Sequence, residues 1–350
     1  MLDIVASHCA WSHSKKAMVA TVSIDRVDLL MPICHMGLVR TTGQIVSTGS
    51  SSMTVEVIAE KEDRMRRTFV MAFSSLVTMV VIDTVTLRPV PGSVPQLEMQ
   101  TAGDIAKKEQ VEKRRKVFQE WQKLTKEKLD MPITANDLNE EMAIQGKRRE
   151  YLTIPETLVT VRKQAMPRYL NHNKTMFGGD ILIWMEKLAT YTAKRFTGND
   201  HVMTLTMNRV AFKHPILVED VLHMEASVVY VRKYVLEVEI KCFVDGPRTH
   251  GLAPSHTGYF TIMSLDSVGF KREIMVGIKL DDNDKESIVR YVQAKERFEF
   301  DRKLKLEEEG AEHINGTKKI TPAVSEPELD RIRYAKDEGD LESRFYLSAP

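Results

Sequence analysis

The stretch NHNKTMFGGDILIWMEKLATYTAK, from Asn171 to Lys194, joins a polar loop, two adjacent glycines and a helical pattern. From Asp180 to Phe196, apolar residues return every three or four positions, as side chains on one face of an α-helix do. Gly178 and Gly179 stand directly before this helix, where their missing side chains let the backbone approach a neighbour closely. The stretch therefore predicts a long helix with an accessible start.

The chain contains the same pattern a second time, nearer its beginning. LDIVASHCAWSH, from Leu2 to His13, continues the same helix face when Asp3 is set against Glu186, an offset of 183 residues. The same offset holds without a gap for Arg26-Val27 and Arg209-Val210, Pro32-Ile33 and Pro215-Ile216, Val55-Glu56 and Val238-Glu239, and Asp83 and Asp266. Such a fixed register over this distance indicates an internal repeat.

Strand-like segments follow each helix. They are rich in Val, Thr, Met and Tyr, and their turns carry Asp, Gly and Pro. Phe69–Ile82, the longest apolar stretch, is shorter than the roughly 20 residues of a membrane span and is expected to be a strand. The other expected strands are Val202–Phe212, Val221–Tyr230, Tyr234–Phe243 and His256–Leu265. One helix followed by antiparallel strands predicts an α+β unit in which the sheet wraps the helix.

The repeat divides the chain into four predicted parts. These are a first domain at 1–100, a charged helical linker at 101–149, a second domain at 150–280, and a charged helix with a disordered tail at 281–350. The charged helices, Ile105–Lys128 and Ser287–Glu309, are each expected to pack onto their own domain through Phe118 and Trp121, or Phe298 and Phe300.

The second copy has upstream features that the first copy lacks. An extended segment near Glu156–Lys163 precedes its helix, and the counterpart of Gly179 would fall before residue 1. We interpret the chain as a truncated gene product, a fragment or a start-site error, with a genuine short isoform as the alternative. The three cysteines, without a CxxC pair, indicate a reducing intracellular compartment, either mitochondrial or cytoplasmic.

Composition and motif searches disfavour several classes of function. With 50 basic and 49 acidic residues the net charge is +1, which does not favour a nucleic-acid partner. The ten histidines show no HExxH or paired Cys/His spacing, so no metal is expected. GxSxG, GxxxxGKS and GxGxxG patterns are also missing, and neither a cofactor nor a membrane span is expected.

The stretch from Asn171 to Lys194 resembles the loop and central helix of eukaryotic tandem hotdog acyl-CoA thioesterases, and LDIVASHCAWSH resembles the same helix in their N-terminal domain. The similarity continues through NRVAFKHPILVEDVLHMEASVVYV and DRVDLLMPICHMGLVRTTGQIV and covers roughly residues 1–85 and 150–268. It implies two tandem hotdog domains, each a long central helix wrapped by an antiparallel sheet, with the first truncated at its N-terminus. It also implies hydrolysis of fatty acyl-CoA to fatty acid and CoA, and a homo-oligomer of double-hotdog units.

In that family the thioester carbonyl lies at one helix start, and a carboxylate of the partner helix handles the attacking water. Carried onto this sequence, the resemblance implies Asp3 as the carboxylate and Gly178 and Gly179 as the helix start. Unpaired amides at a helix start stabilise a developing oxyanion, and a carboxylate can act as general base or nucleophile. Thr175 stands where relatives carry Asn, and Thr175 or Asn173 is expected to orient the carbonyl or the water.

Further residues are expected to bind substrate: Phe177, Asn171, Glu186, Thr204 and Arg114. Arg114, with Lys113 and Arg115, is expected to neutralise the phosphates of CoA. Glu186 occupies the carboxylate position of copy two without a glycine pair opposite it, so a structural role is the alternative. Thr204 and its repeat partner Thr21 also fit simple sheet packing.

Two alternatives to hydrolysis stay open. A double-hotdog protein impaired in catalysis would act as an acyl-CoA-binding or scaffolding protein. A hotdog dehydratase would need a paired Asp and His in the loop before the helix, and His172 alone does not supply that pair.

Overall fold

The computed structural model describes residues 1–31, 33, 37–63, 67–98, 101–131, 133–144, 148–171, 174–247, 249 and 251–315. Cys34, His172, Asn173 and the tail predicted to be disordered, from 316 onward, lie outside the described residues. Of the described cysteines, Cys9 and Cys242 are free thiols.

The two copies fold into the same succession of one helix and several strands. The first copy contains α1 (Leu2–His13), β1 (Val19–Ile24), β2 (Val27–Asp28), β3 (Val39–Thr48), β4 (Ser52–Asp63) and β5 (Thr68–Val81). The second contains α4 (Gly178–Thr197), β8 (Val202–Phe212), β9 (Val221–Val231), β10 (Val235–Asp245) and β11 (Ala253–Ser264). β1 and β8 start 183 residues apart, as do β4 and β10, so the strands follow the offset found in the sequence.

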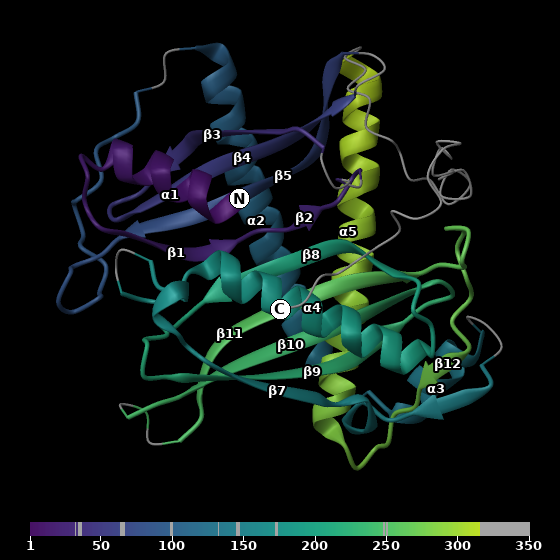
Figure 1. Cartoon of the computed structure of the whole chain (residues 1–350). Helices are drawn as coiled ribbons and strands as arrows, with labels where there is room; N and C mark the ends of the chain where they lie inside the picture. The colour runs from purple at the N-terminus through teal and green to yellow at the C-terminus, as the bar shows by residue number, and fades with distance from the viewer. Residues whose placement is uncertain are drawn as a thin grey trace.

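The strands form one antiparallel sheet that runs through both copies. Its order is β3-β4-β5-β1-β8-β11-β10-β9-β7, with β2 paired to β8 off this path. The copies join where β1 pairs β8, at Ser23 opposite Ala211 and Ile24 opposite Val210. Figure 1 shows α1 and α4 on the same face of this shared sheet.

Alternation along the strands separates two faces of the sheet. In β4, Val55 and Val57 point into the core that contains Ala6 of α1, because adjacent strand residues point to opposite faces. Glu56, between them, forms an ion pair with Lys107 on the other side. The helix α2 (Ala102–Leu129) therefore lies on the face opposite α1.

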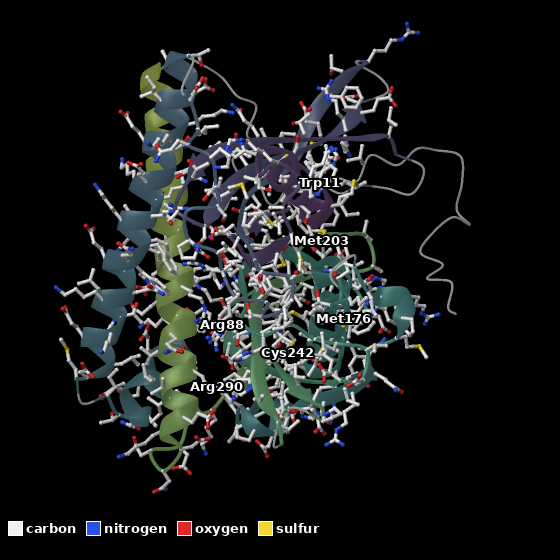
Figure 2. All side chains as sticks on the ribbon, turned by 90° about the vertical axis from the view of Figure 1, so that its left-hand side faces the viewer. Trp11, Arg88, Met176, Met203, Cys242 and Arg290 are labelled. Carbon is white, nitrogen blue, oxygen red and sulfur yellow. The ribbon has the colours of Figure 1, made fainter. Side chains whose placement is uncertain are left out.

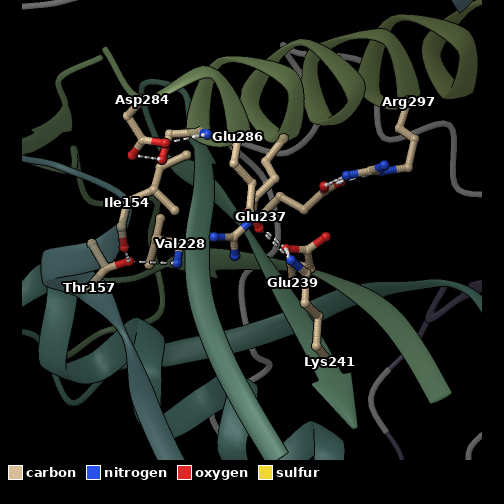
Figure 3. A network of polar contacts seen from close by, with 11 residues as sticks. Ile154, Thr157, Val228, Glu237, Glu239, Lys241, Asp284, Glu286 and Arg297 are labelled. Carbon is tan, nitrogen blue, oxygen red and sulfur yellow. Dashed lines mark hydrogen bonds and ion pairs between the residues drawn. The ribbon is translucent and has the colours of Figure 1, made fainter. Parts of the chain in front are cut away.

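The helix α5 (Lys285–Asn315) repeats this docking on the second copy. Arg290 Nε lies 2.6 Å from Glu239 Oε2, and Lys107 Nζ lies 2.8 Å from Glu56 Oε2. The two ion pairs correspond at the offset of 183, Arg290 to Lys107 and Glu239 to Glu56. Arg297 forms a second ion pair, with Glu237 (Figure 3). Figure 2 shows α2 and α5 together on one side of the sheet, with α1 and Trp11 on the other.

One expectation about these helices is wrong. Phe118 and Trp121 of α2 pack against Phe300 of α5, at ring-centroid distances of 6.5 and 5.2 Å, rather than onto the first domain alone. The reason is that the two long helices are neighbours, so their facing aromatic side chains bury each other. Phe298 does pack onto its own copy, against Tyr230.

The remaining elements surround the second copy. They are α3 (Ala135–Ile144), β6 (Glu150–Leu152), the 3-10 turns η1 (Pro155–Thr157) and η2 (Pro167–Tyr169), β7 (Val159–Gln164) and β12 (Val276–Ile278). β7, which overlaps the extended segment expected near Glu156–Lys163, pairs with β9 and ends the sheet.

A long helix packed on an antiparallel sheet, present twice, confirms the predicted tandem hotdog fold. The domain boundaries at 100, 149 and 280 stay a prediction. Among the helices in the described part of the chain, none combines the length and the apolar character needed to cross a membrane.

Candidate active site between the two copies

The start of α4 is a close contact point between the copies. Its N-cap residue, Phe177, donates its amide to the Tyr169 carbonyl, which ties the preceding loop to the helix start. A Cβ atom at Gly179 would lie 2.6 Å from the Phe177 ring, and one at Gly178 would lie 2.9 Å from a carboxylate oxygen of Asp3. Only glycine fits these two positions without displacing a neighbour.

Asp3 is held at this helix start by two hydrogen bonds. The Gly179 amide donates to its Oδ2 at 3.2 Å, and the Thr21 hydroxyl donates to its Oδ1 at 2.5 Å. Asp3 as a whole residue is 3% exposed. Asp3 lies in α1 and Gly179 in α4, so the pairing expected across the copies is present in the structure.

The environment of Asp3 changes its acidity. Burial raises the pKa of this carboxyl, and the hydrogen bonds from Thr21 and Gly179 lower it in part. A carboxylate with a raised pKa is a better proton acceptor near neutral pH. Because Asp3 lies against the first amides of α4, a carbonyl oxygen bound there would be within its reach.

The loop before α4 is closed by its own side chains. Thr175 donates its hydroxyl to Asn171 Oδ1 at 3.1 Å, and the backbone of Asn171 donates to the Thr175 carbonyl. Both predicted site residues therefore lie in the loop beside Gly178 and Gly179, bonded to each other. The position of Asn173 lies outside the described residues.

The equivalent carboxylate of copy two has different partners. Glu186 accepts hydrogen bonds from Thr204 at 2.8 Å and from Thr190 at 3.1 Å, both within its own copy. The Thr204 bond repeats the one from Thr21 to Asp3, at the same offset. The predicted substrate contacts of Glu186 and Thr204 are thus not part of the group around Asp3.

Arg114 is also separate from this group. It lies on α2, and the sheet stands between α2 and the face that carries α1 and α4 (Figure 2). A contact between Arg114 and a phosphate stays a prediction. The helix that carries Arg114 lies on the far side of the sheet from Asp3.

Three neighbours of the site are not evident from local motifs. For Thr21, the sequence leaves open a place in the site or simple sheet packing, and the signal for the site is that a Thr follows both helix carboxylates by 18 residues. Phe212, at the end of β8, lies 3.3 Å from the Cβ position of Gly178, and His256 of β11 packs against the Phe212 ring. These two come from strands distant in sequence, and only the fold brings them here.

The described residues form no cluster of metal-binding side chains. In the portion of the chain that the structure describes, no group of three or more His, Cys, Asp or Glu residues could hold a metal ion.

Comparison with known proteins assigns both copies to one family model. Residues 1–68 and 173–249 match the thioesterase superfamily. These segments contain Asp3 and Thr21 in the first copy, and Gly178 and Gly179 in the second.

Among curated relatives, protein VdlD of Helicobacter pylori is 30% identical over 115 residues, which is 33% of this chain and 66% of VdlD. YkhA of Bacillus subtilis, described as an uncharacterized acyl-CoA thioester hydrolase, is 28% identical over 114 residues with the same coverage. The match thus spans slightly less than two thirds of each relative's length. An acyl-CoA hydrolase from Staphylococcus aureus, solved with butyryl-CoA and CoA, is 24% identical, with a TM-score of 0.42 over 48% of this chain and 98% of that one.

Proposed function

Because two segments of this chain match the thioesterase superfamily model, we propose that the protein hydrolyses the thioester of fatty acyl-CoA to free fatty acid and CoA. The observation that carries this proposal is the hydrogen bond from the Gly179 amide to the buried carboxylate of Asp3. It joins a helix start that can polarise a carbonyl to a base that can activate water.

The proposed reaction begins with an exchange of hydrogen-bond partners. The thioester carbonyl oxygen takes the place of Asp3 Oδ2 as acceptor of the Gly179 amide, and Oδ2 becomes available to a water molecule. Thr21 keeps its bond to Oδ1 and holds the carboxylate in place. The helix-start amide then stabilises the negative charge that develops on the carbonyl oxygen.

Proton movement completes the proposed cycle. The oxygen of the water molecule attacks the carbonyl carbon, and Asp3 accepts a proton from that water. This step forms a tetrahedral intermediate. The carbon–sulfur bond breaks, and the CoA thiolate receives the proton from Asp3. The products are the carboxylic acid and CoA thiol, and Asp3 returns to its ionised form.

The name of the Bacillus subtilis relative supports this substrate class, since it is described as an acyl-CoA thioester hydrolase. Assembly of double-hotdog units into a homo-oligomer is likewise proposed from the family resemblance. Light scattering coupled to size-exclusion chromatography measures it directly, and a mass of about 40.0 kDa would indicate a monomer instead.

The proposal is tested by measuring the release of free CoA from purified protein and a series of acyl-CoA thioesters. We expect Asp3→Asn to lower kcat by about a hundredfold or more, in the range of a lost general base. Asp83→Asn removes an exposed carboxylate from a turn of the same copy and serves as the matched control.

Two outcomes would contradict the proposal. Hydrolysis that persists unchanged in Asp3→Asn removes Asp3 from the mechanism. Tight binding of acyl-CoA without release of CoA by the wild-type protein identifies it as an acyl-CoA-binding or scaffolding protein.

A further inference from the structure

The aromatic ring of Phe212 lies beside Gly178 and Asp3 in the candidate active site. The Cβ position of Gly178 is 3.3 Å from Phe212 Cε1, 3.5 Å from Phe212 Cζ and 2.9 Å from Asp3 Oδ2. The ring edge and the carboxylate thus border the same small space beside the helix start. A thioester carbon placed next to Asp3 would lie within reach of the ring.

Phe212 is fixed from behind by a neighbouring strand. It stands directly opposite His256 in the pairing of β8 with β11. The two rings pack edge to face with centroids 4.9 Å apart. His256 is 3% exposed and shares a hydrogen bond with Ser255. The aromatic side chain is therefore backed by a rigid, buried partner.

The charge state of His256 is compatible with an apolar surface formed by the Phe212 ring, which is called the aromatic wall below. Burial, with a smaller contribution from His214, lowers the pKa of His256 to about 3. The imidazole is therefore neutral at physiological pH and places no charge beside the substrate.

Phe212 belongs to an apolar seam between the copies. Leu182, Met207 and Phe212 each pack against both hydrophobic cores, that of the first copy and that of the second. An alkyl chain gains free energy by leaving water for such a surface, whereas the amide-containing arm of CoA does not. The seam is thus the apolar side of the site, and Phe212 is its member beside Asp3 and Gly178.

The internal repeat shows that this wall is specific to one half of the molecule. At the offset of 183, Leu29 corresponds to Phe212 and Phe73 corresponds to His256. Leu29 is 44% exposed, so the first copy has no equivalent aromatic wall at that position. Of these two repeat-related positions, the one beside the glycine pair that contacts Asp3 carries the aromatic ring.

We propose that Phe212 determines acyl-chain specificity, restricting the site to short-chain acyl-CoA thioesters such as acetyl- and butyryl-CoA. This proposal rests on the proposed thioesterase function. An acyl group bound next to Asp3 meets the ring edge. A short chain ends there, whereas a long chain must displace the ring from its packing against His256. Removing the ring opens the seam between Leu182 and Met207 to longer chains.

The test compares kcat/KM for butyryl-CoA and palmitoyl-CoA in wild type, Phe212→Ala and Phe212→Leu. We expect the wild type to favour butyryl-CoA by at least about tenfold, and Phe212→Ala to narrow or reverse this ratio by a similar factor, mainly through KM. Phe212→Leu should give an intermediate ratio. Leu29→Ala, the same truncation at the repeat-related position, should leave the ratio unchanged.

Binding provides a second readout that does not depend on turnover. Calorimetry with the non-hydrolysable thioethers S-butyl-CoA and S-hexadecyl-CoA should show the same selectivity in wild type and its loss in Phe212→Ala. Should Phe212→Ala fail to fold, the wild-type ratio and Phe212→Leu still decide the question.

The two proposals fail in different ways. Hydrolysis of every acyl-CoA at background rates contradicts the thioesterase function itself. Asp3-dependent hydrolysis that prefers palmitoyl-CoA in wild type, or a ratio unaltered in folded Phe212 variants, overturns only the role of Phe212.

Discussion

At the scale of one residue, the Asp3 carboxylate is subject to two opposing requirements, ionisation and burial. Catalysis in the proposed reaction requires it to be ionised, and its burial disfavours the ionised form. The hydrogen bonds from Thr21 and Gly179 offset part of this cost. Because burial outweighs these hydrogen bonds and raises the pKa of Asp3, the native state disfavours the ionised form of this carboxyl.

This imbalance predicts a stabilising substitution. The folded protein holds the Asp3 proton more tightly than the unfolded chain, so stability falls as pH rises from the ordinary value of 3.8 through the raised folded pKa. Asn cannot ionise, and we expect Asp3→Asn to raise Tm by a few degrees at pH 7 while lowering kcat by about a hundredfold or more. The gain should shrink as pH is lowered toward 3.8, which thermal melts at several pH values measure. A lower Tm for Asp3→Asn at pH 7 would mean that the two hydrogen bonds outweigh burial.

The residues of the site were predictable only where the repeat, a local motif or the family resemblance marked them. The glycine pair is visible in the sequence, and the fixed offset identifies Asp3 as the counterpart of Glu186. Phe212 and His256 carry no such mark, because each belongs to a strand and contacts the site through sheet pairing. Side-chain neighbours of this kind depend on tertiary structure rather than on local sequence.

At the scale of the element, the start of α4 has little spare volume. A methyl group at position 178 would fall 2.9 Å from Asp3 Oδ2 and 3.3 Å from the Phe212 ring. Alanine is otherwise preferred to glycine in helices by about 1 kcal/mol, so the expected effect is on geometry rather than on folding.

We therefore expect Gly178→Ala to lower kcat/KM by roughly a hundredfold, the scale of a misplacement of about 1 Å in a reacting group. Tm should change by only a few degrees. Gly103→Ala is the control, because this glycine also lies at a helix start and its added Cβ would be 3.5 Å from the nearest atom, an ordinary contact. Equal kcat/KM in Gly178→Ala and wild type would show that the close approach has no part in the reaction.

Helices and strands were largely predictable because their periodicity is local. The expected strand Phe69–Ile82 corresponds to β5 (Thr68–Val81), and Asp180–Phe196 lies within α4. The packing of Trp121 against Phe300 could not be predicted in this way, because it depends on α2 and α5 lying side by side on the sheet. The amphipathic pattern of a helix indicates that a face is buried but does not identify what buries it.

At the scale of the whole molecule, the two copies are joined by ion pairs that break the symmetry of the repeat. Arg26 of the first copy bonds Asp28 and reaches Asp301 of α5 at 2.5 Å. Its repeat partner, Arg209, lies 3.6 Å from Asp25 and stacks over Phe118. Phe118 is the residue that corresponds to Asp301 at the offset of 183. Beside Arg209, an aromatic ring thus stands at the position where Arg26 has a carboxylate.

Of these two ion pairs between the copies, we expect the one between Arg26 and Asp301 of α5 to contribute more to stability. The side chains of Arg26 and Asp301 are 22% and 18% exposed, against 45% and 41% for Arg209 and Asp25. Burial raises the pKa of Asp301, and Arg26 lowers it in part, so the pair is desolvated as well as close. Removing one partner of such a pair leaves an uncompensated charge, whereas exposed pairs contribute little.

We expect Arg26→Met to destabilise the protein by about 2 kcal/mol, because Asp301 and Asp28 lose their common cation. The matched variant, Arg209→Met, should cost less than about 1 kcal/mol, as for an exposed pair. Urea unfolding followed by fluorescence measures both values. Adding Asp301→Leu to Arg26→Met should recover part of the loss, since it removes the charge left without a partner. Equal losses in Arg26→Met and Arg209→Met, with no recovery in the double variant, would show that the Arg26–Asp301 pair is no stronger a junction than the Arg209–Asp25 pair.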